Sequence, residues 1–210
     1  MSDTQLLKWS ELADKKVVEK TINSLKANGI NAFHFKNKEE AKKKVLELIP
    51  KGAEVMNMTS VTLDSLGIPK EINESGNYDS VRDKLNKIDR KTQNVEIQKL
   101  WTAPEYVIGS VNVVTEDGKV VVVSNTGSQL PAYAYGSGHV IWVVGTQKIV
   151  KNIDEAMKRI YEYVLPLESV RANKAYNMTG GSNVSKVLIF NKEINPSRLN
   201  LIFVDEVLGF

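Results

Sequence analysis

Apolar residues recur along the chain with two different spacings, and these spacings alternate. Apolar residues three and four positions apart predict amphipathic helices, and short continuous apolar runs predict buried strands. Gly29, Pro50 and Gly67 follow such stretches and mark where helices stop. The elements predicted for the first part of the chain are a helix over 4–28, a strand over 31–35, a helix over 38–49, a strand over 53–58 and a short helix that Thr59 or Ser60 caps.

The second part of the chain has a stronger strand pattern. Residues 68–79 are rich in Gly, Pro, Asn and Ser, which predicts a loop, and a long charged helix with Val81 and Leu85 on its buried face follows. The later segments are rich in β-branched residues and contain a hairpin turn at 116–118. The remaining predictions are strands over 105–111, 112–115, 119–124, 139–144, 186–190 and 199–204, a short helix over 129–136, and an amphipathic helix over 153–164 with Tyr161 on its apolar stripe, ended by Pro166.

Strands that alternate with helices predict an α/β fold, with a mostly parallel sheet and helices on both of its faces. The hairpin adds one antiparallel element to this arrangement. A chain of 210 residues, 42% of them hydrophobic, has the size and apolar content of one such domain. We therefore expect a single domain over 1–210.

Composition excludes several classes of protein. Because cysteine is absent, the chain has no disulfide, no thiolate nucleophile and no cysteine-ligated zinc or iron–sulfur cluster, so we predict no cofactor of its own. A net charge of +3 gives no strong attraction to nucleic acid or to a membrane. The first residues lack a signal-peptide pattern and the apolar runs are too short to span a bilayer, which predicts a cytoplasmic protein.

Several common catalytic motifs are missing from the sequence. His34 and His139 lie within or beside predicted strands without a Gly-x-Ser-x-Gly or His-Glu-x-x-His motif, which disfavours a Ser-His-Asp hydrolase and a histidine zinc site. No Walker A motif is present, and no Gly-x-Gly-x-x-Gly follows the first strand, which disfavours a nucleotide hydrolase and a dinucleotide-binding site. The lysines of 36–44 alternate with glutamates on a helix, as is typical of a solvated face.

Two polar loops, 58–62 and 124–129, each follow a predicted strand and precede a predicted helix. Hydroxyls and free backbone N–H groups at a helix start bind phosphate or carboxylate, although the first loop has the alternative role of a helix cap only. Gly127 permits close approach of the backbone to a ligand, with a purely structural turn as the alternative. If both strands are parallel neighbours, the loops share the carboxyl-end rim where open α/β sheets bind ligands. The candidate ligand-binding residues in these loops are Ser60, Thr62, Asn125, Thr126, Gly127, Ser128 and Gln129.

A third candidate is Arg171, which follows the amphipathic helix. An arginine near a polar loop can clamp an anion through paired hydrogen bonds, and Asn173, Asn177 and Thr179 lie close to it in sequence. Arg171 would supply the positive charge that the neutral donors of the two loops lack. The alternative is an ordinary surface contact.

Several segments, taken in order, carry a resemblance to a known family. They are 106–118 (YVIGSVNVVTEDG), 126–132 (TGSQLPA), 143–150 (VVGTQKIV) and 153–168, preceded by 59–68 (TSVTLDSLGI). Together they resemble the lactate-utilization (LUD) domain family over nearly the whole chain from about residue 10. The resemblance implies a Rossmann-like, mostly parallel sheet, similar to that of the sugar-phosphate isomerase and CoA-transferase group.

The resemblance also implies a function. It implies a part in the oxidation of L-lactate to pyruvate, beside partner proteins that carry iron–sulfur clusters. These 210 residues contain neither a cysteine nor the cysteine-rich extension of the larger family members, so we expect electron transfer to belong to the partners. We expect an accessory protein that binds a small anionic metabolite or nucleotide.

Two alternatives remain open. One is a non-catalytic interaction module, which would have a large exposed apolar patch and no pocket at the loop pair. The other is an enzyme of the sugar-phosphate isomerase or CoA-transferase type, acting on a phosphorylated or acyl-CoA substrate. Such an enzyme would need a carboxylate in the cleft.

The residues that could serve such an enzyme are few. A more distant similarity to the initiation-factor-2B and methylthioribose-phosphate isomerase group places Asn112 where those isomerases have an acidic catalytic residue. A neutral amide is neither an acid nor a base near pH 7, so Asn112 is a candidate ligand contact instead. CoA transferases need a glutamate nucleophile, for which Glu105 and Glu116 are the nearest candidates. A buried position for either of them, or for Asp117, beside the two loops would favour an enzyme.

Overall fold

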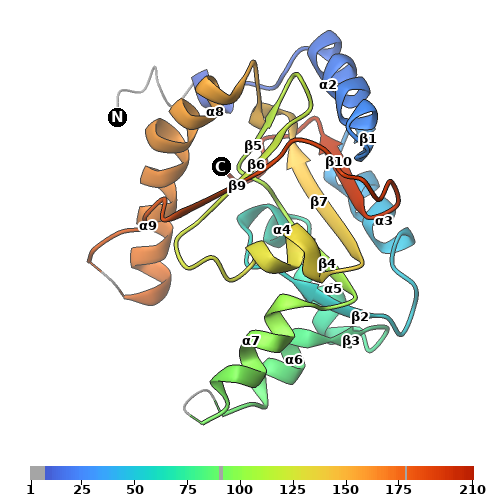
Figure 1. Ribbon diagram of the computed structural model, residues 1–210, viewed down its shortest axis with the longest axis vertical. Helices are drawn as coiled ribbons and strands as arrows, with labels where there is room; N and C mark the ends of the chain where they lie inside the picture. The colour runs from blue at the N-terminus through green and yellow to red at the C-terminus, as the bar shows by residue number, and fades with distance from the viewer. Residues whose placement is uncertain (1–7, 90–91, 178) are drawn as a thin grey trace.

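The computed structural model describes residues 8–89, 92–177 and 179–210. Its centre is a sheet of six parallel strands in the order β1-β10-β7-β4-β2-β3 (Figure 1). This confirms the predicted Rossmann-like, mostly parallel sheet. The strands are β1 (Asn31–Phe35), β2 (Glu54–Asn57), β3 (Asp79–Ser80), β4 (Tyr106–Gly109), β7 (His139–Gly145) and β10 (Leu199–Val204).

The strands of this sheet other than the short edge strand β3 pack apolar side chains on both faces. In β7, Val140 and Trp142 point to one face, and Ile141 and Val143 point to the other. A sheet covered on both sides requires apolar residues at successive positions, which explains the continuous apolar runs in the sequence.

Helices cover both faces of the parallel sheet. The first face packs against α2 (Lys15–Ala27), α6 (Val81–Asn86) and α7 (Asn94–Thr102), and the second against α3 (Lys38–Glu47), α4 (Val61–Ser65) and α5 (Ile68–Glu74). Ser80 caps α6 and Asn37 caps α3 through side-chain oxygens that accept backbone N–H groups. Among the described helices, none is long and apolar enough to cross a membrane.

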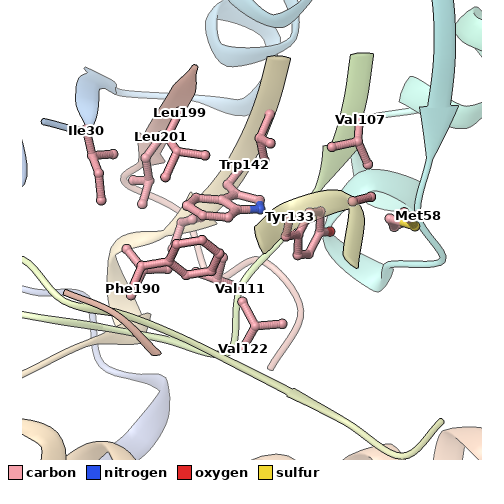
Figure 2. Packing of buried hydrophobic residues seen from close by; sticks show 14 of the residues in the cluster. Ile30, Met58, Val107, Val111, Val122, Tyr133, Trp142, Phe190, Leu199 and Leu201 are labelled. Carbon is pink, nitrogen blue, oxygen red and sulfur yellow. The ribbon is translucent and has the colours of Figure 1, made fainter. Parts of the chain in front are cut away.

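A second sheet of four strands packs on the first face, in the order β8-β5-β6-β9. Trp142 of the parallel sheet makes edge contacts with Phe190 of the second sheet and with Tyr133, at ring-centroid distances of 5.0 and 5.5 Å (Figure 2). The two sheets therefore share one apolar core. The strands of the second sheet are β5 (Val113–Thr115), β6 (Val120–Ser124), β8 (Ile149–Val150) and β9 (Lys186–Phe190), and Tyr133 belongs to the π-helix η1 (Ala132–Gly136).

The predicted hairpin is confirmed, but it does not extend the parallel sheet. β5 and β6 pair antiparallel across the turn at 116–118, where Gly118 has a φ of 80°. Both strands lie in the second sheet, with β8 and β9 at its edges. The hairpin therefore forms the middle of a separate layer.

A helical layer covers the far face of the second sheet. It consists of α8 (Ile153–Arg159), the π-helix η3 (Ile160–Val164) and α9 (Leu165–Tyr176), which follow one another without a break. Ala156 and Ile160 from this layer pack with Val113 and Val121 of the second sheet. Figure 1 shows these helices on the side of the second sheet away from β7.

Two predictions about this last helix were wrong, and the π-helix bears on both. A π-turn holds an extra residue, so the side chains that follow it shift around the helix axis. Tyr163 is therefore buried, at 6% exposure, while Tyr161 is 53% exposed instead of lying on the buried stripe. Pro166 does not end the helix: it lies where the π-helix η3 passes into α9, and the helix continues to Tyr176. The change from π to α hydrogen bonding at this point accommodates the missing N–H of proline.

The predicted loop at 68–79 was also wrong over its first part. Gly67 takes a φ of 64° and Pro69 falls in the first turn of α5, so both residues start a helix instead of breaking one. Ile68 and Ile72 are buried one turn apart. This single buried contact row holds α5 against β2.

Other differences concern where helices begin and end. The long charged helix predicted after residue 79 is two helices, α6 and α7. Of the helix predicted over 4–28, residues 4–7 lie outside the described residues, and a turn of helix at 8–10 is separated from α2 by 11–14. The predicted short helix over 129–136 is the π-helix η1.

Candidate ligand-binding cleft

A cleft of about 590 Å³ opens at the carboxyl ends of the parallel strands. Part of its lining follows β2, β4 and β7, namely 59–62, 110–112 and Lys148. Most of the rest comes from the end of β6 with 125, 126, 128 and 129, and from α9 with 181–184. Open α/β sheets bind ligands at this edge, so the location agrees with a ligand site.

Lys148 is a buried cation in the lining of this cleft. It ends the short 3₁₀ helix η2 (Thr146–Lys148) after β7, and 2% of it is exposed. Its Nζ lies 3.3 Å from Thr62 Oγ1, 3.2 Å from Ser110 Oγ and 3.2 Å from the carbonyl oxygen of Val111. Within the described ranges it forms no ion pair, so no carboxylate neutralises its charge.

Burial, and to a smaller extent the positive charge of Arg159, lowers the pKa of Lys148 to about 7. Arg159 is itself buried and donates to the carbonyl oxygens of Asn112, at 2.9 Å, and of Trp9, at 3.4 Å. Burial lowers the pKa of Arg159 to about 10. The two cations therefore bind successive carbonyls of the turn after β4, and near pH 7 Lys148 exists in both protonation states.

Eight of the nine predicted ligand-binding residues line this cleft. The exception is Gly127, which has a φ of 87° and where a Cβ would meet Lys186 Cδ at 2.5 Å. The turn requires its positive φ, and the Lys186 side chain occupies the space that a Cβ would need. The eight lining residues are Ser60, Thr62, Asn112, Asn125, Thr126, Ser128, Gln129 and Arg171. The structure brings these side chains together, and their contact with a ligand stays a prediction.

The two loops meet at one cleft, but the condition proposed for this, that their strands are parallel neighbours, is not met. The loop at 58–62 follows β2, which belongs to that sheet, but 124–129 follows β6, which is antiparallel to its neighbours in the second sheet. The loops meet because the second sheet packs on the first. The loop after β6 is held by Ser124, which accepts from the Gly127 N–H at 2.8 Å and donates to Gln129 Oε1 at 2.9 Å.

Ser60 and Thr62 both have structural partners. Ser60 caps α4 by accepting from the Leu63 N–H at 3.4 Å, which is the alternative role considered for this loop. Thr62 is 1% exposed and donates to the carbonyl oxygen of Leu208 at 3.1 Å. Thr62 therefore acts on the cleft through Lys148, which it accepts from, more than through a free hydroxyl.

Arg171 lines the cleft, but a carboxylate already binds its guanidinium. Its Nε and NH2 each donate to Glu168 at 2.7 Å, in a bidentate pair one helical turn apart. The bond to Glu168 raises the pKa of Arg171. Asn173 and Asn177, grouped with it from the sequence, do not line the cleft, and Asn173 accepts from the Gly181 N–H instead. Arg171 is therefore weaker as an anion clamp than its sequence position indicates.

The carboxylates considered for catalysis lie outside the cleft. Glu105 and Asp117 are exposed, and Glu116 pairs with Lys20 at 2.7 Å. Two other carboxylates line the cleft, Asp64 and the arginine-bound Glu168. No group of three or more His, Asp or Glu in the described part of the chain is arranged to hold a metal ion.

Both histidines lie away from the cleft. His34 Nε2 is 2.8 Å from Asp205 Oδ1 at the edge of the parallel sheet. The ring of His139 stacks on Tyr106, with 4.4 Å between the ring centroids. These positions agree with the structural or surface roles that the sequence favours.

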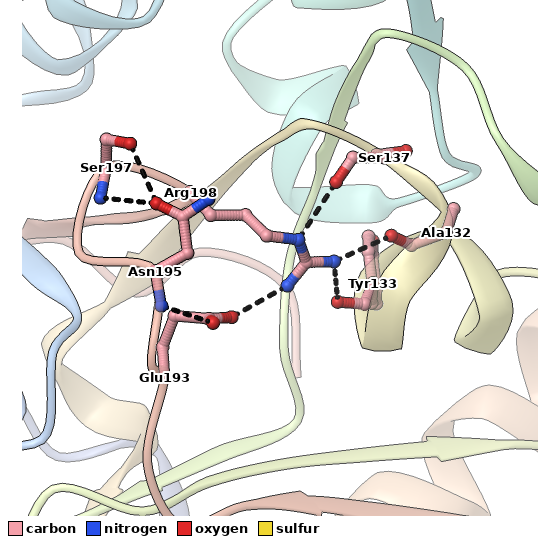
Figure 3. Close-up of polar contacts among 7 residues, drawn as sticks. All are labelled: Ala132, Tyr133, Ser137, Glu193, Asn195, Ser197 and Arg198. Carbon is pink, nitrogen blue, oxygen red and sulfur yellow. Dashed lines mark hydrogen bonds and ion pairs between the residues drawn. The ribbon is translucent and has the colours of Figure 1, made fainter.

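A buried arginine fixes the π-helix beside the cleft. Arg198 donates from Nε to the carbonyl of Ser137 at 2.9 Å, and from NH2 to the carbonyls of Ala132 and Tyr133 at 3.2 and 2.6 Å (Figure 3). Its NH1 pairs with Glu193 at 2.8 Å. The arginine thus binds three carbonyls at and after η1, of which that of Ala132 also accepts from the Ser137 N–H at 3.1 Å.

This fixed π-helix determines which residue can precede Ser110. Tyr133 lines the cleft and its hydroxyl covers Gly109, where an added Cβ would lie 1.7 Å from the hydroxyl oxygen. Only glycine lets the end of β4 pass this close to Tyr133. The position of the turn at 110–112 therefore depends on the packing of Tyr133 against Gly109.

Sequence reasoning did not identify Lys148, Ser110 or Arg198 as site residues. The signal for Lys148 was its place directly after the strongest predicted strand, inside the segment 143–150 that carries the family resemblance. Ser110 likewise follows a strand. For Arg198 there was no such signal, because the carbonyls that it binds are 61 to 66 residues away in the chain.

Comparison with known proteins agrees with this architecture. The family model described as LUD domain matches residues 18–204. The chain belongs to the LUD domain family. The solved structure of a DUF162 family protein from Deinococcus radiodurans is similar to this LUD-domain chain, with a TM-score of 0.57 and 11% identity over 92% of this chain and 99% of that one. At this identity the likeness shows the fold alone.

Two further comparisons add no support for a function. A ribose 5-phosphate isomerase from Plasmodium falciparum is 12% identical over 80% of this chain and 93% of that chain, with a TM-score of 0.37. A likeness of this size supports no argument about the LUD-domain chain. The search among curated proteins gave no match.

Proposed function

We propose that this LUD-domain chain is an accessory protein of lactate utilization that binds a small anionic metabolite in its cleft. Membership of the family supports the lactate-utilization role at the family level. In this role the chain would act in the oxidation of L-lactate to pyruvate with partner proteins that carry iron–sulfur clusters. Because the chain has no cysteine to ligate such a cluster, electron transfer would fall to the partners.

The observation that carries the binding proposal is the unneutralised ammonium of Lys148. A buried charge without an opposite charge destabilises the fold, and such groups occur at sites where function uses them. An anion in the adjoining cleft would offset this cost by Coulomb attraction, which is strong at short range in a partly buried site. Binding would in turn raise the pKa of Lys148.

Neutral and charged donors around Lys148 support the same proposal. Thr126 and Ser128 line the cleft on its second-sheet side, and both are exposed. Arg82 lines it beside the first loop, donates to Thr59 Oγ1 at 2.9 Å and lies over the Trp101 ring at 4.7 Å. An acid between these groups would meet hydroxyls on one side and a held guanidinium on the other.

The two alternatives have less support. Isomerase or CoA-transferase chemistry would need a reactive carboxylate in the cleft, and Glu105, Glu116 and Asp117 do not line it. The two carboxylates that do are Glu168, which Arg171 binds, and the exposed Asp64. A pure interaction module would have no pocket between the two loops, whereas the loops line a cleft of about 590 Å³. Small-molecule binding therefore agrees best with the geometry.

The test is a thermal-shift screen followed by calorimetry, with lactate, pyruvate, sugar phosphates, adenine nucleotides and CoA. A ligand at about 100 times its dissociation constant adds roughly 2.7 kcal/mol to stability, which raises the melting temperature by several degrees. We expect an anionic ligand to bind more tightly at about pH 6 than at about pH 9, because Lys148 is protonated only in the lower range.

Variants locate the site. Lys148→Met should remove the pH dependence, and Thr126→Ala with Ser128→Ala should weaken binding. Lys151→Met, three residues further on at an exposed position, should change neither. Binding that is unchanged in Lys148→Met, or no shift with any of the compounds, would contradict the proposal.

A further inference from the structure

We infer that Ser110 and Lys148 form a serine–lysine dyad that hydrolyses an ester or thioester of the acid that the cleft binds. Both residues line the cleft, and Ser110 Oγ lies 3.2 Å from Lys148 Nζ. Ser110 directly follows β4 and Lys148 follows β7, and these strands are neighbours at the middle of the parallel sheet. The inference rests on the proposed function, because the bound acid is the product of the hydrolysis.

Hydrogen-bond directions around Nζ determine what Lys148 can do to Ser110. The Thr62 hydroxyl donates to the Leu208 carbonyl, so toward Lys148 it accepts, and the Val111 carbonyl can only accept. A neutral amine has two N–H groups and one lone pair, and these two acceptors use both N–H groups. Of the three oxygens that contact Nζ in the described structure, only that of Ser110 can donate to the lone pair.

The surroundings favour this arrangement over an inert polar contact. A serine hydroxyl becomes a nucleophile when an adjacent base takes its proton, and a lysine serves as that base when it is neutral near the working pH. Burial without a carboxylate partner keeps much of Lys148 neutral at pH 7. In the structure Lys148 Nζ donates to Ser110 Oγ at 3.2 Å, as the ammonium form requires, and the Ser110 hydroxyl donates to the Val111 carbonyl at 3.5 Å. The contact to the Val111 carbonyl is the longer and weaker one, so the hydroxyl can turn to Nζ when the amine is neutral.

Asn112 supplies a donor for the carbonyl oxygen of the substrate. Its Oδ1 accepts from the Val123 N–H at 2.8 Å, which fixes the amide plane and leaves Nδ2 as the free end. Nδ2 has no acceptor among the described residues, and Asn112 lines the same cleft two residues after Ser110. A fixed amide N–H that meets the developing oxyanion is the usual source of stabilisation in acyl transfer.

The reaction needs only water as co-reactant. Ser110 Oγ forms a bond to the carbonyl carbon while its proton moves to Lys148 Nζ. The bond from that carbon to the leaving oxygen or sulfur then breaks, and the protonated Lys148 returns the proton to the leaving group. Water attacks the acyl-serine in the same way, with Lys148 again taking and returning the proton. The products are the free acid, the alcohol or thiol, and the unchanged enzyme.

The full chain is tested with p-nitrophenyl acetate as the probe, at about pH 8. We expect nitrophenolate release and one acetyl group on Ser110, located by peptide mass spectrometry. Ser110→Ala should abolish both, and Lys148→Met should slow acylation by roughly 10²–10⁴-fold, the usual contribution of a general base. The wild-type rate should fall as the pH drops below about 7, because the base becomes protonated.

Two controls separate the dyad from incidental reactivity. Ser65→Ala removes an exposed serine outside the cleft lining and Lys151→Met removes an exposed lysine, and both should keep the wild-type rate. Ser110→Ala removes one partly exposed hydroxyl, so it tests the dyad even if Lys148→Met fails to fold. Acetylation of another residue, Lys148 included, or undiminished release by Ser110→Ala would overturn the dyad.

The outcome for the dyad is distinguishable from that for binding. Calorimetry with the anion found in the ligand screen is repeated on Ser110→Ala. Anion binding without any acylation of the wild-type chain would overturn the dyad and leave the proposed function standing. Acylation at Ser110 without binding of any anion would uphold the dyad chemistry and contradict the proposed ligand class.

Discussion

The ammonium group of Lys148 has a pKa of about 7 in the folded chain, against 10.5 for an unburied lysine. Between these two values the unfolded state binds more protons than the folded state, so the free energy of unfolding rises with pH. The slope from one such group is at most about 1.4 kcal/mol per pH unit. Below about pH 7 both states are protonated and the destabilisation is complete.

Replacing Lys148 by methionine should remove this pH dependence. We expect the free energy of unfolding of Lys148→Met to exceed that of the wild-type chain by most below about pH 7. The difference should shrink as the pH approaches 10.5. Urea unfolding of both proteins at about pH 6, 8 and 10 measures the difference. Lys151→Met, at an exposed position, should show a flat difference. A flat difference for Lys148→Met would mean that burial does not lower the pKa.

A second residue-scale prediction concerns Gly109. Alanine there places a Cβ 1.7 Å from the Tyr133 hydroxyl oxygen and 2.8 Å from Cζ, and the buried Tyr133 is held by η1 and cannot move freely. Overpacking of this kind costs about 1–3 kcal/mol or more, so the melting temperature of Gly109→Ala should fall by several degrees. Gly138→Ala is the matched control, because its Cβ would meet only Glu105 O, at 3.8 Å. Equal melting temperatures would contradict the packing.

At the scale of elements, the best-predicted helices and strands are those whose hydrophobic pattern does not depend on contacts with distant parts of the chain. β7 and β10 are buried on both faces and read as continuous apolar runs. α5 was missed because Gly67 and Pro69 usually break helices, and here both fit its start. The position of Tyr161 was missed because a π-turn depends on what the helix packs against, which a fixed 3.6-residue period cannot reveal.

In the candidate site too, the parts with a local sequence pattern were predicted and the part that depends on distant contacts was not. The loops at 58–62 and 124–129 were predicted as polar segments at strand ends, which is a local pattern. Lys148 was not, because a lysine after a strand reads as an exposed turn, and its burial arises from Thr62 and Val111, 86 and 37 residues away. The cation that makes the cleft chemically distinctive therefore depends on long-range packing.

The link between η1 and Arg198 gives a prediction at this scale. Arg198 and Glu193 form a buried pair, with side chains 8% and 11% exposed. Arg198→Lys keeps the charge but cannot reach the carbonyls of Ser137, Ala132 and Tyr133 in the same fork geometry. A buried carbonyl left without a donor costs about 1–3 kcal/mol, so we expect a total loss of about 3–5 kcal/mol. Denaturant unfolding measures it.

A comparison with a second single variant separates the two parts of this link. Glu193→Gln removes the charge pair but leaves the carbonyl contacts of Arg198, so it should cost less than Arg198→Lys. If Glu193→Gln costs as much, the ion pair holds η1 and the carbonyl contacts do not.

At the scale of the whole molecule, the three apolar clusters share strands. Val114 and Val120 of the hairpin pack toward the parallel sheet, whereas Val113 and Val121 of the same strands pack toward α8 and η3. Arg159 of α8 also binds the carbonyl of Asn112 in the turn after β4. Unfolding of one layer would expose the apolar face of the next, which favours the single domain that length and composition predict.

The three tryptophans give a direct test of this single domain, because each lies in a different part. Trp9 packs in the outer helical layer, Trp142 between the sheets and Trp101 on α7. In variants that keep one tryptophan and replace the others by phenylalanine, we expect the fluorescence midpoint in urea to coincide with the far-UV circular dichroism midpoint of the same variant. Comparison within one variant cancels the stability lost by substitution. A fluorescence midpoint for Trp9 at a lower urea concentration than the circular dichroism midpoint would mean that the outer helices unfold separately. A ligand in the cleft, which is lined by both the sheets and α9, should then bring these two midpoints together.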